Sequence, residues 1–142
     1  MTKRIWQEIV DDGDLSVVDD LVAEEYVYRG PGGLELHGPE GFRRYIGSLH
    51  ELFGEIDVNV HEYIADGNRV LSRWTGHGRH RETGREVTWR GATVTRVAGG
   101  KMVTDWEYWD RLELAEQLAT GWLQQLLVEA VAKRTKEKLP EE

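Results

Sequence analysis

The sequence predicts an α+β fold in which N-terminal helices pack on one face of a curved antiparallel sheet. Two observations support this. Apolar residues recur at helical spacing as far as residue 53, and from residue 55 they alternate along strands. Three turn sequences, ADGN, TG and AGGK, then divide the second half of the chain into four strands. With 142 residues and no linker or repeat, residues 1–142 are predicted to form one domain.

Three helices are predicted before the strands. Residues 3–11 are amphipathic, and a second short helix follows from the spacing of Leu15, Val18, Leu21 and Val22. The stretch VYRGPGG predicts a short strand that runs into a loop. Pro39 then suits the first turn of a helix over GPEGFRRYIGSLHELF, whose apolar positions are Phe42, Ile46, Leu49 and Phe53.

After the last strand, a helical extension is predicted at about 111–138, with a break near Gly121. Asp110 and Glu113 have the spacing of a helix N-cap pair, so Asp110 is interpreted as a cap. The apolar positions of this extension are expected to dock on the sheet or on a second subunit; they are Leu112, Leu118, Trp122, Leu126 and Val131.

Composition argues against several functional classes. The net charge of −8 disfavours nucleic-acid binding. The chain has no run of eighteen apolar residues, so no membrane span is predicted. The absence of cysteine excludes disulfides and thiolate metal sites and predicts a cytoplasmic location. The five histidines lack metal-binding spacing, and no nucleophile elbow, P-loop or dinucleotide motif is present. Neither a metal nor a cofactor is therefore expected.

Turn lengths predict which residues pair across the strands. A two-residue turn at Thr83–Gly84 pairs Trp74 with Thr93, and a three-residue turn over 98–100 pairs Thr93 with Asp105. Alternation then predicts a pocket face on which three glycines leave space beside large aromatic walls. Its members are Ser72, Trp74, Gly76, Gly78, His80, Val87, Trp89, Gly91, Thr93, Thr95, Val103, Asp105, Glu107 and Trp109. Ile56, Val58, Val60 and Ile64 are predicted to share one face of the preceding strand.

The opposite face of the sheet carries arginines together with Met102, Trp106 and Tyr108. This mixture suits solvent or a contact between subunits, so a homodimer is expected through this face.

Glu107 is the candidate acid or base. A carboxyl group on an apolar, partly closed face pays a desolvation cost that raises its pKa, which suits proton transfer. Asp105 faces the same way and is expected to bond with Thr93. Two structural alternatives remain open: Glu107 at a solvated mouth or paired with backbone or arginine, and Trp74, Trp89 and Trp109 as ordinary core.

Four stretches in order resemble the SnoaL-like polyketide cyclase family of the nuclear transport factor 2-like superfamily: ELHGPEGFRRYIGSLHELF, VHEYIADGNRVLSRWTGHGRH, TGREVTWRGATVTRV and GGKMVTDWEYWD. The resemblance implies a cone of helices against a curved sheet with an apolar pocket, often dimeric. The family's acid/base aspartate falls on Glu107. Thr93 stands where the cyclases have a histidine, and Tyr28 where they offer an asparagine to the ligand. The arginine and second aspartate of related epoxide hydrolases fall on Trp74 and Gly76.

The resulting hypothesis is a protein that binds a small hydrophobic, aromatic or polyketide-like molecule and acts as a cofactor-independent cyclase or isomerase through Glu107. The predicted substrate-binding residues are Tyr28, Trp74, Trp89, Thr93, Trp109, Asp105 and His80. One alternative is a non-catalytic ligand-binding or oligomerisation module on the same fold. A weaker one is epoxide hydrolysis.

Overall fold

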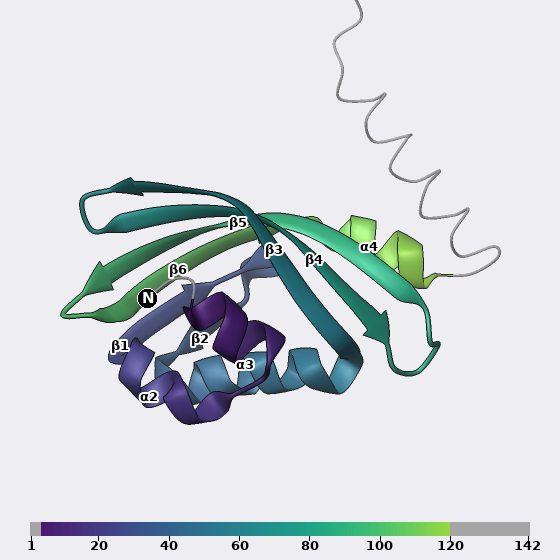
Figure 1. Cartoon of the computed structure of the whole chain (residues 1–142), viewed down its shortest axis with the longest axis horizontal. Coiled ribbons are helices and arrows are strands. Elements are labelled where there is room, and N and C mark those ends of the chain that lie inside the picture. The colour runs from purple at the N-terminus through teal and green to yellow at the C-terminus, as the bar shows by residue number, and fades with distance from the viewer. Residues whose placement is uncertain (1–3, 120–142) are drawn as a thin grey trace, which may run out of the picture.

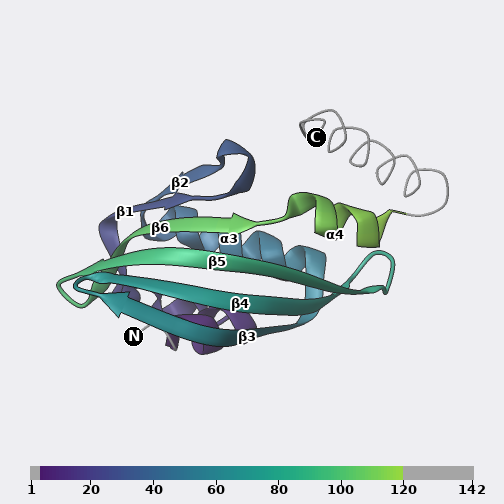
Figure 2. The ribbon, with the colours of Figure 1, turned by 90° about the horizontal axis from the view of Figure 1, so that it is seen from above.

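The computed structural model describes residues 4–119, which form a curved six-stranded sheet with helices against its concave face (Figure 1). The strands are β1 (Val22–Arg29), β2 (Glu35–His37), β3 (Phe53–Asp66), β4 (Arg69–His80), β5 (Glu86–Ala98) and β6 (Lys101–Trp109). Seen from above in Figure 2, they lie in the order β2-β1-β6-β5-β4-β3. The predicted α+β fold and curved sheet are confirmed, with one difference: β1 pairs with β6 in parallel, whereas all other pairs are antiparallel.

Short helical segments cover the concave face. They are η1 (Ile5–Asp11), η2 (Leu15–Val17) and α2 (Val18–Leu21), together with the long helix α3 (Gly38–Leu52). The short segment η3 (Pro31–Gly33) lies instead in the loop between β1 and β2. Pro39 lies in the first turn of α3, and Phe42 and Ile46 are buried on its inner face. Val22 and Phe53, predicted as helical, instead begin strands, because the apolar spacing extends one residue beyond each helix.

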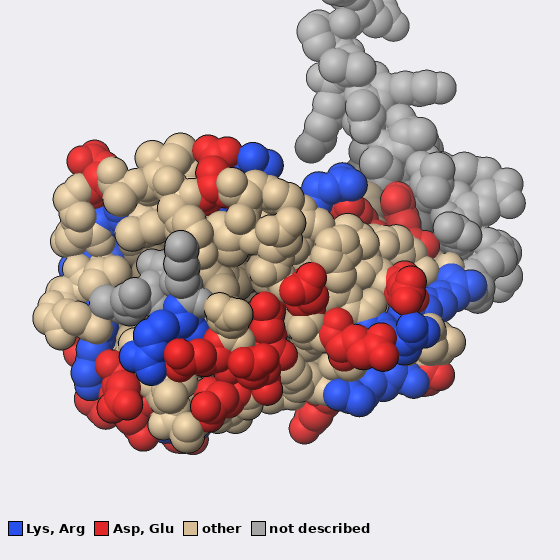
Figure 3. Space-filling view, viewed as in Figure 1, with Lys and Arg blue, Asp and Glu red and all other residues tan. Residues whose placement is uncertain are grey.

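Charged side chains of both signs gather over the helical segments in the lower part of Figure 3, whereas the surface above them is mostly uncharged. Within residues 4–119, no helix has the length and apolar character needed to cross a membrane.

The two hairpin registers differ from prediction by two residues each. The β4–β5 turn spans Arg81–Gly84, with the Gly84 N–H donating to the His80 carbonyl at 2.7 Å, so Trp74 pairs with Gly91. In β6 an extra residue follows a two-residue Gly99–Gly100 turn, so Thr93 pairs with Glu107. A shift of two residues preserves the face of each side chain, so these two differences in register leave the predicted pocket face unchanged.

Bulges move two side chains to the face opposite the predicted one. A register shift between Val60 and Glu62 turns Ile64 away from Val58 and Val60, and Ile64 is 53% exposed. The extra residue in β6 buries Met102, which was predicted on the outer face. Turn spacing alone does not reveal such bulges.

Helix α4 (Arg111–Leu118) follows β6 and lies at one end of the sheet (Figure 1). The predicted cap is confirmed: Asp110 Oδ1 accepts from the N–H groups of Leu112 (2.8 Å) and Glu113 (3.2 Å). Glu113 pairs with Arg90 at 3.3 Å rather than reaching back to the cap. The rest of the predicted extension, including Gly121, Trp122, Leu126 and Val131, lies outside the described residues.

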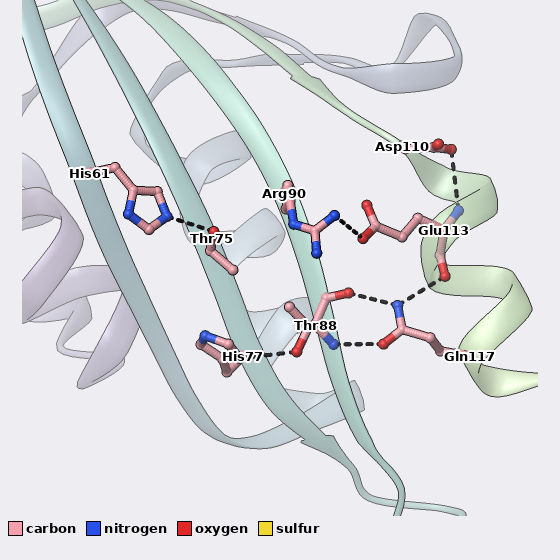
Figure 4. Close-up of polar contacts among 8 residues, drawn as sticks. All are labelled: His61, Thr75, His77, Thr88, Arg90, Asp110, Glu113 and Gln117. Atoms are coloured by element: carbon pink, nitrogen blue, oxygen red, sulfur yellow. Dashed lines mark hydrogen bonds and ion pairs between the residues drawn. The ribbon is translucent and has the colours of Figure 1, made fainter.

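The side chain of Gln117 fixes α4 against β5, as Figure 4 shows. It accepts from the Thr88 N–H at 2.8 Å and donates to the Thr88 carbonyl at 2.6 Å. β6 ends opposite Gly91, so it does not pair with Thr88 of β5. The Gln117 side-chain amide supplies the two backbone hydrogen bonds that Thr88 does not receive from β6.

Candidate functional site

A cavity of about 290 Å³ lies between the concave face of the sheet and the segments η1, α3 and α4. That volume corresponds to on the order of ten water molecules. Its wall is mainly apolar and aromatic; the aromatic members are Trp6, Tyr28, Phe42, Tyr45, Phe53, Trp74, Trp89 and Trp109. Glu107 and all seven side chains predicted to bind substrate line it. Their assignment to substrate remains a prediction.

Two tryptophans lie over glycines of the neighbouring strand. A Cβ on Gly91 would lie 2.5 Å from Trp74 Cζ2, and a Cβ on Gly76 would lie 2.7 Å from Trp89 Cε2. Gly78 is likewise covered by Phe53 at 3.3 Å. The prediction that these glycines leave open pocket space is therefore wrong. They make room for rings that pack against the sheet.

Glu107 is held by three hydroxyl groups from three different elements. Tyr28 of β1 and Tyr45 of α3 both donate to Oε1, at 2.9 Å and 2.8 Å. Thr93 of β5 donates to Oε2 over a longer 3.3 Å. The Glu107 side chain is buried in the cavity wall, and no ion pair to it occurs within the described residues. The solvated and arginine-paired alternatives for Glu107 therefore do not match this structure.

Burial raises the pKa of Glu107, because the charged form loses hydration, while the bonds from Tyr45, Tyr28 and Thr93 act in the opposite direction, as does the nearby Trp109 indole. Since Oε1 already accepts two phenol hydrogens, the proton of the neutral acid belongs on Oε2. Oε2 is thus the oxygen available for proton transfer.

Asp105, two residues before Glu107 in β6, is also bonded by hydroxyl groups. Tyr26 donates to Oδ2 at 2.7 Å and Thr95 donates to Oδ1 at 2.5 Å. The predicted partner Thr93 is wrong, because the two-residue register shift places Thr95 opposite Asp105. Burial raises the pKa of Asp105 to about 7, although the Thr95 and Tyr26 bonds favour its charged form.

The tryptophan N–H groups differ in what they can offer a ligand. Trp74 Nε1 donates to Thr93 Oγ1 at 3.0 Å, which directs the Thr93 hydroxyl hydrogen toward Glu107. Trp109 Nε1 is buried and makes no hydrogen bond of acceptable geometry within residues 4–119, although the indole lies close enough to Glu107 and Tyr28 to favour the charged form of each. A buried donor without a partner is costly. Trp109 is therefore the indole best able to bond a ligand oxygen.

His80 and Trp89 lie at the β4–β5 end of the cavity, around Phe53. The His80 ring centroid lies 5.7 Å from that of Phe53, and its Nδ1 is 2.9 Å from Thr83 Oγ1. His80 shares no hydrogen-bond partner with Glu107 among the described residues. It therefore contributes to the cavity wall and not to the group of hydroxyls around Glu107.

Three residues of the site were missed from the sequence. Tyr26 alternates with Tyr28 on β1, so the period of two could have placed it on the pocket face. Tyr45 lies three residues after Phe42 and four before Leu49, on the inner side of α3. Trp6, whose ring centroid is 5.5 Å from that of Trp74, carries no comparable local pattern.

Within residues 4–119, no group of three or more histidine, aspartate or glutamate side chains has the arrangement of a metal site. The carboxyl and imidazole groups in the cavity wall, those of Glu107, Asp105 and His80, are each bonded to hydroxyl groups of the protein.

The family model described as SnoaL-like polyketide cyclase matches residues 1–118. No curated protein matches the chain.

Several solved structures share the fold. A protein described as a "putative polyketide cyclase" from Acidithiobacillus ferrooxidans is 25% identical, with a TM-score of 0.73 over 82% of this chain and 90% of that one. IdmH from Streptomyces antibioticus, described in the same words, is 22% identical, with a TM-score of 0.74 over 84% and 96%. A Catenulispora acidiphila protein with a ketosteroid isomerase-like fold is 16% identical, with a TM-score of 0.72 over 79% and 87%.

Proposed function

This chain belongs to the SnoaL-like polyketide cyclase family, and we propose that it is a cofactor-independent cyclase or isomerase in which Glu107 is the general acid and base. The proposed ligand is a small hydrophobic molecule of aromatic or polyketide-like character that carries a carbonyl group. The observation that carries the proposal is a buried carboxyl group in the wall of an apolar cavity, hydrogen-bonded by three hydroxyl groups and paired with no cation within the described residues.

In the proposed reaction, Oε2 of ionised Glu107 removes a proton from a carbon next to the ligand carbonyl. The C–H electron pair moves into the carbon–carbon bond, and the carbonyl oxygen becomes an enolate. In a cyclisation, the enolate carbon attacks a second carbonyl of the ligand, and Glu107 returns its proton to the new alkoxide. In an isomerisation, the ligand carries a carbon–carbon double bond beside the α carbon, so the enolate is a conjugated dienolate, and Glu107 returns the proton to its γ carbon.

Trp109 is the proposed donor to the enolate oxygen. The hydroxyls of Tyr28 and Thr93 already bond Glu107, and the Trp74 N–H already bonds Thr93. The buried N–H of Trp109 is unpartnered within the described residues. A preorganised donor at a developing oxyanion accelerates such reactions because it need not reorganise when charge appears.

The cavity supports an enzyme over a non-catalytic module of the same fold. A binding or oligomerisation module would be favoured by a cavity filled with core side chains and a Glu107 that reaches bulk water. Here about 290 Å³ is open and Glu107 is 8% exposed. Epoxide hydrolysis has less support, because Trp74 and Gly76 supply neither a cation nor a second carboxylate.

Proton transfer can be tested without the natural substrate. The α-hydrogens of 2-tetralone, an enolisable bicyclic ketone, exchange with deuterium in D2O, and NMR follows their loss. We expect the wild-type protein to accelerate exchange and Glu107→Gln to lose roughly 10²- to 10⁴-fold of that acceleration. The matched control is Glu86→Gln, which alters a glutamate whose side chain is 79% exposed. Equal rates for Glu107→Gln and wild type, in a folded variant, contradict the proposal.

A homodimer through the outer face of the sheet is part of the proposal. Trp106 and Tyr108 are 45% and 61% exposed on this face, and Arg29 lies 4.9 Å from the centroid of the Trp106 ring. Exposed aromatics beside arginine are typical of interface cores. Sedimentation equilibrium should give twice the chain mass, and the mass of one chain would rule the dimer out.

A further inference from the structure

We propose that Gly30 is a positioning residue for Glu107, whose missing side chain provides the space in which the Tyr28 phenol reaches the carboxyl group. Gly30 follows β1 and lies two residues after Tyr28. A Cβ at Gly30 would lie 2.5 Å from the Tyr28 hydroxyl oxygen and 2.6 Å from its Cε1. Real Cβ atoms essentially never come so close to another heavy atom.

The backbone at Gly30 gives no other reason for glycine. Its φ of −119° and ψ of −175° are extended values that any residue can adopt. Gly32 and Gly33 in the same loop differ, because their φ values of +75° and +76° lie in the left-handed region. At Gly30 the requirement is therefore for space beside the phenol.

The side chain that a Cβ at position 30 would displace is Tyr28, which bonds Glu107 directly. Tyr28 donates to Glu107 Oε1 at 2.9 Å, and its ring lies 4.7 Å from the Tyr45 ring, whose hydroxyl donates to the same oxygen. A methyl group at position 30 pushes the Tyr28 hydroxyl out of this arrangement.

The consequence is chemical as well as structural. A hydroxyl that donates to the carboxylate favours the charged form of Glu107. Losing that bond makes Glu107 a weaker acid, so its carboxylate forms at higher pH. This consequence for catalysis rests on the proposed function, whereas the contact between residue 30, Tyr28 and Glu107 does not.

The experiment is a titration of the Glu107 carboxyl carbon by ¹³C NMR in protein labelled at glutamate. Tyr28→Phe removes the hydroxyl directly, and Gly30→Ala displaces it. We expect each variant to lower the acid dissociation constant of Glu107 about tenfold, and the double variant to lower it no further. Gly47→Ala is the control, because a Cβ there meets nothing within 4 Å.

Thermal unfolding provides a second readout. Alanine in place of glycine stabilises a protein where space and backbone allow it, so Gly47→Ala should raise Tm. Gly30→Ala should lower Tm because of the clash. If Gly30→Ala is too unstable to titrate, the change is made in the Tyr28→Ala background, where no ring remains for the new Cβ to meet, and the Glu107 titration should then match that of Tyr28→Ala alone.

Two outcomes overturn the inference: a Glu107 titration in Gly30→Ala identical to wild type while Tyr28→Phe shifts it, or additive shifts in the double variant. Neither readout requires turnover. A protein that fails the deuterium-exchange test but shows matching, non-additive titrations therefore refutes the proposed reaction and leaves the role of Gly30 intact.

Discussion

At the scale of single residues, three carboxyl groups close together in sequence have three different surroundings. Asp110 caps α4 through two backbone N–H groups. Asp105 also lies in the cavity wall and bonds Tyr26 and Thr95. Glu107 bonds Tyr28, Tyr45 and Thr93 in the cavity wall. Alternation along β6 separates Asp105 and Glu107 from the exposed Trp106 and Tyr108, and the end of the strand separates Asp110 from both.

Replacing Trp109 by phenylalanine tests the donor assigned to the enolate oxygen. Phe retains most of the aromatic wall but removes the N–H. We expect the tetralone exchange rate at saturation to fall by roughly 10²-fold, as for the loss of one oxyanion donor, with little change in the half-saturating ketone concentration.

Trp106→Phe is the control for this variant, because it makes the same change on the outer face. Should Trp109→Phe retain the exchange rate of Trp106→Phe, Trp109 is not the donor.

At the scale of elements, the pairing of β4 with β5 shapes the floor of the cavity. Trp74 pairs with Gly91 and Trp89 with Gly76, so each indole lies over the glycine opposite it. This reciprocal arrangement lets two large rings pack on adjacent strands at the same level. Trp6 and Phe53 then pack against the two indoles from η1 and β3, with centroid distances of 5.5 Å in both cases.

A side chain at position 91 should disturb this floor. A Cβ there would lie 2.5 Å from the Trp74 ring and 2.7 Å from the backbone oxygen of Tyr108, which cannot move without distorting β6. Gly91→Ala is expected to lower the free energy of unfolding by about 1–3 kcal/mol, measured by urea denaturation.

Gly47→Ala on α3 is the matched comparison, and it should leave stability unchanged or increase it. A Gly91→Ala variant as stable as Gly47→Ala would show that the Trp74 ring can move without cost.

At the scale of the whole molecule, the cavity joins segments from both ends of the described chain. In sequence order, the first residue of its wall is Ile5 of η1 and the last is Leu118 of α4. Asp105 and Glu107 are buried acids in this wall, and Asp11 at the end of η1 is half-buried. Burial raises the pKa of Asp11 to about 6 and that of Asp105 to about 7, and it also raises the pKa of Glu107.

These acids predict that stability falls as pH rises. In the unfolded chain an aspartate ionises near a pKa of about 3.9. Between that pH and the higher folded values, the native state holds protons that the unfolded state has released, so the free energy of unfolding decreases with pH. Urea denaturation should therefore give lower stability at pH 8 than at pH 5.

Asp105→Asn should reduce this difference, because position 105 no longer ionises in either state. Part of the pH dependence should remain from Asp11 and Glu107. An unchanged difference between pH 5 and pH 8 would mean that Asp105 does not titrate as its burial implies.

The sequence by itself determined the fold class, the third helix, the cap at Asp110 and the face on which Glu107 lies. These depend on local periodicity, and a strand keeps its faces even when its register shifts by two residues. Only the tertiary structure decided which side chains meet. The Tyr28 and Tyr45 bonds to Glu107 join residues 79 and 62 positions apart, and the Trp–Gly pairs depend on a longer turn. Such contacts are set by turns, bulges and the packing of α3 across the sheet, which no local pattern encodes.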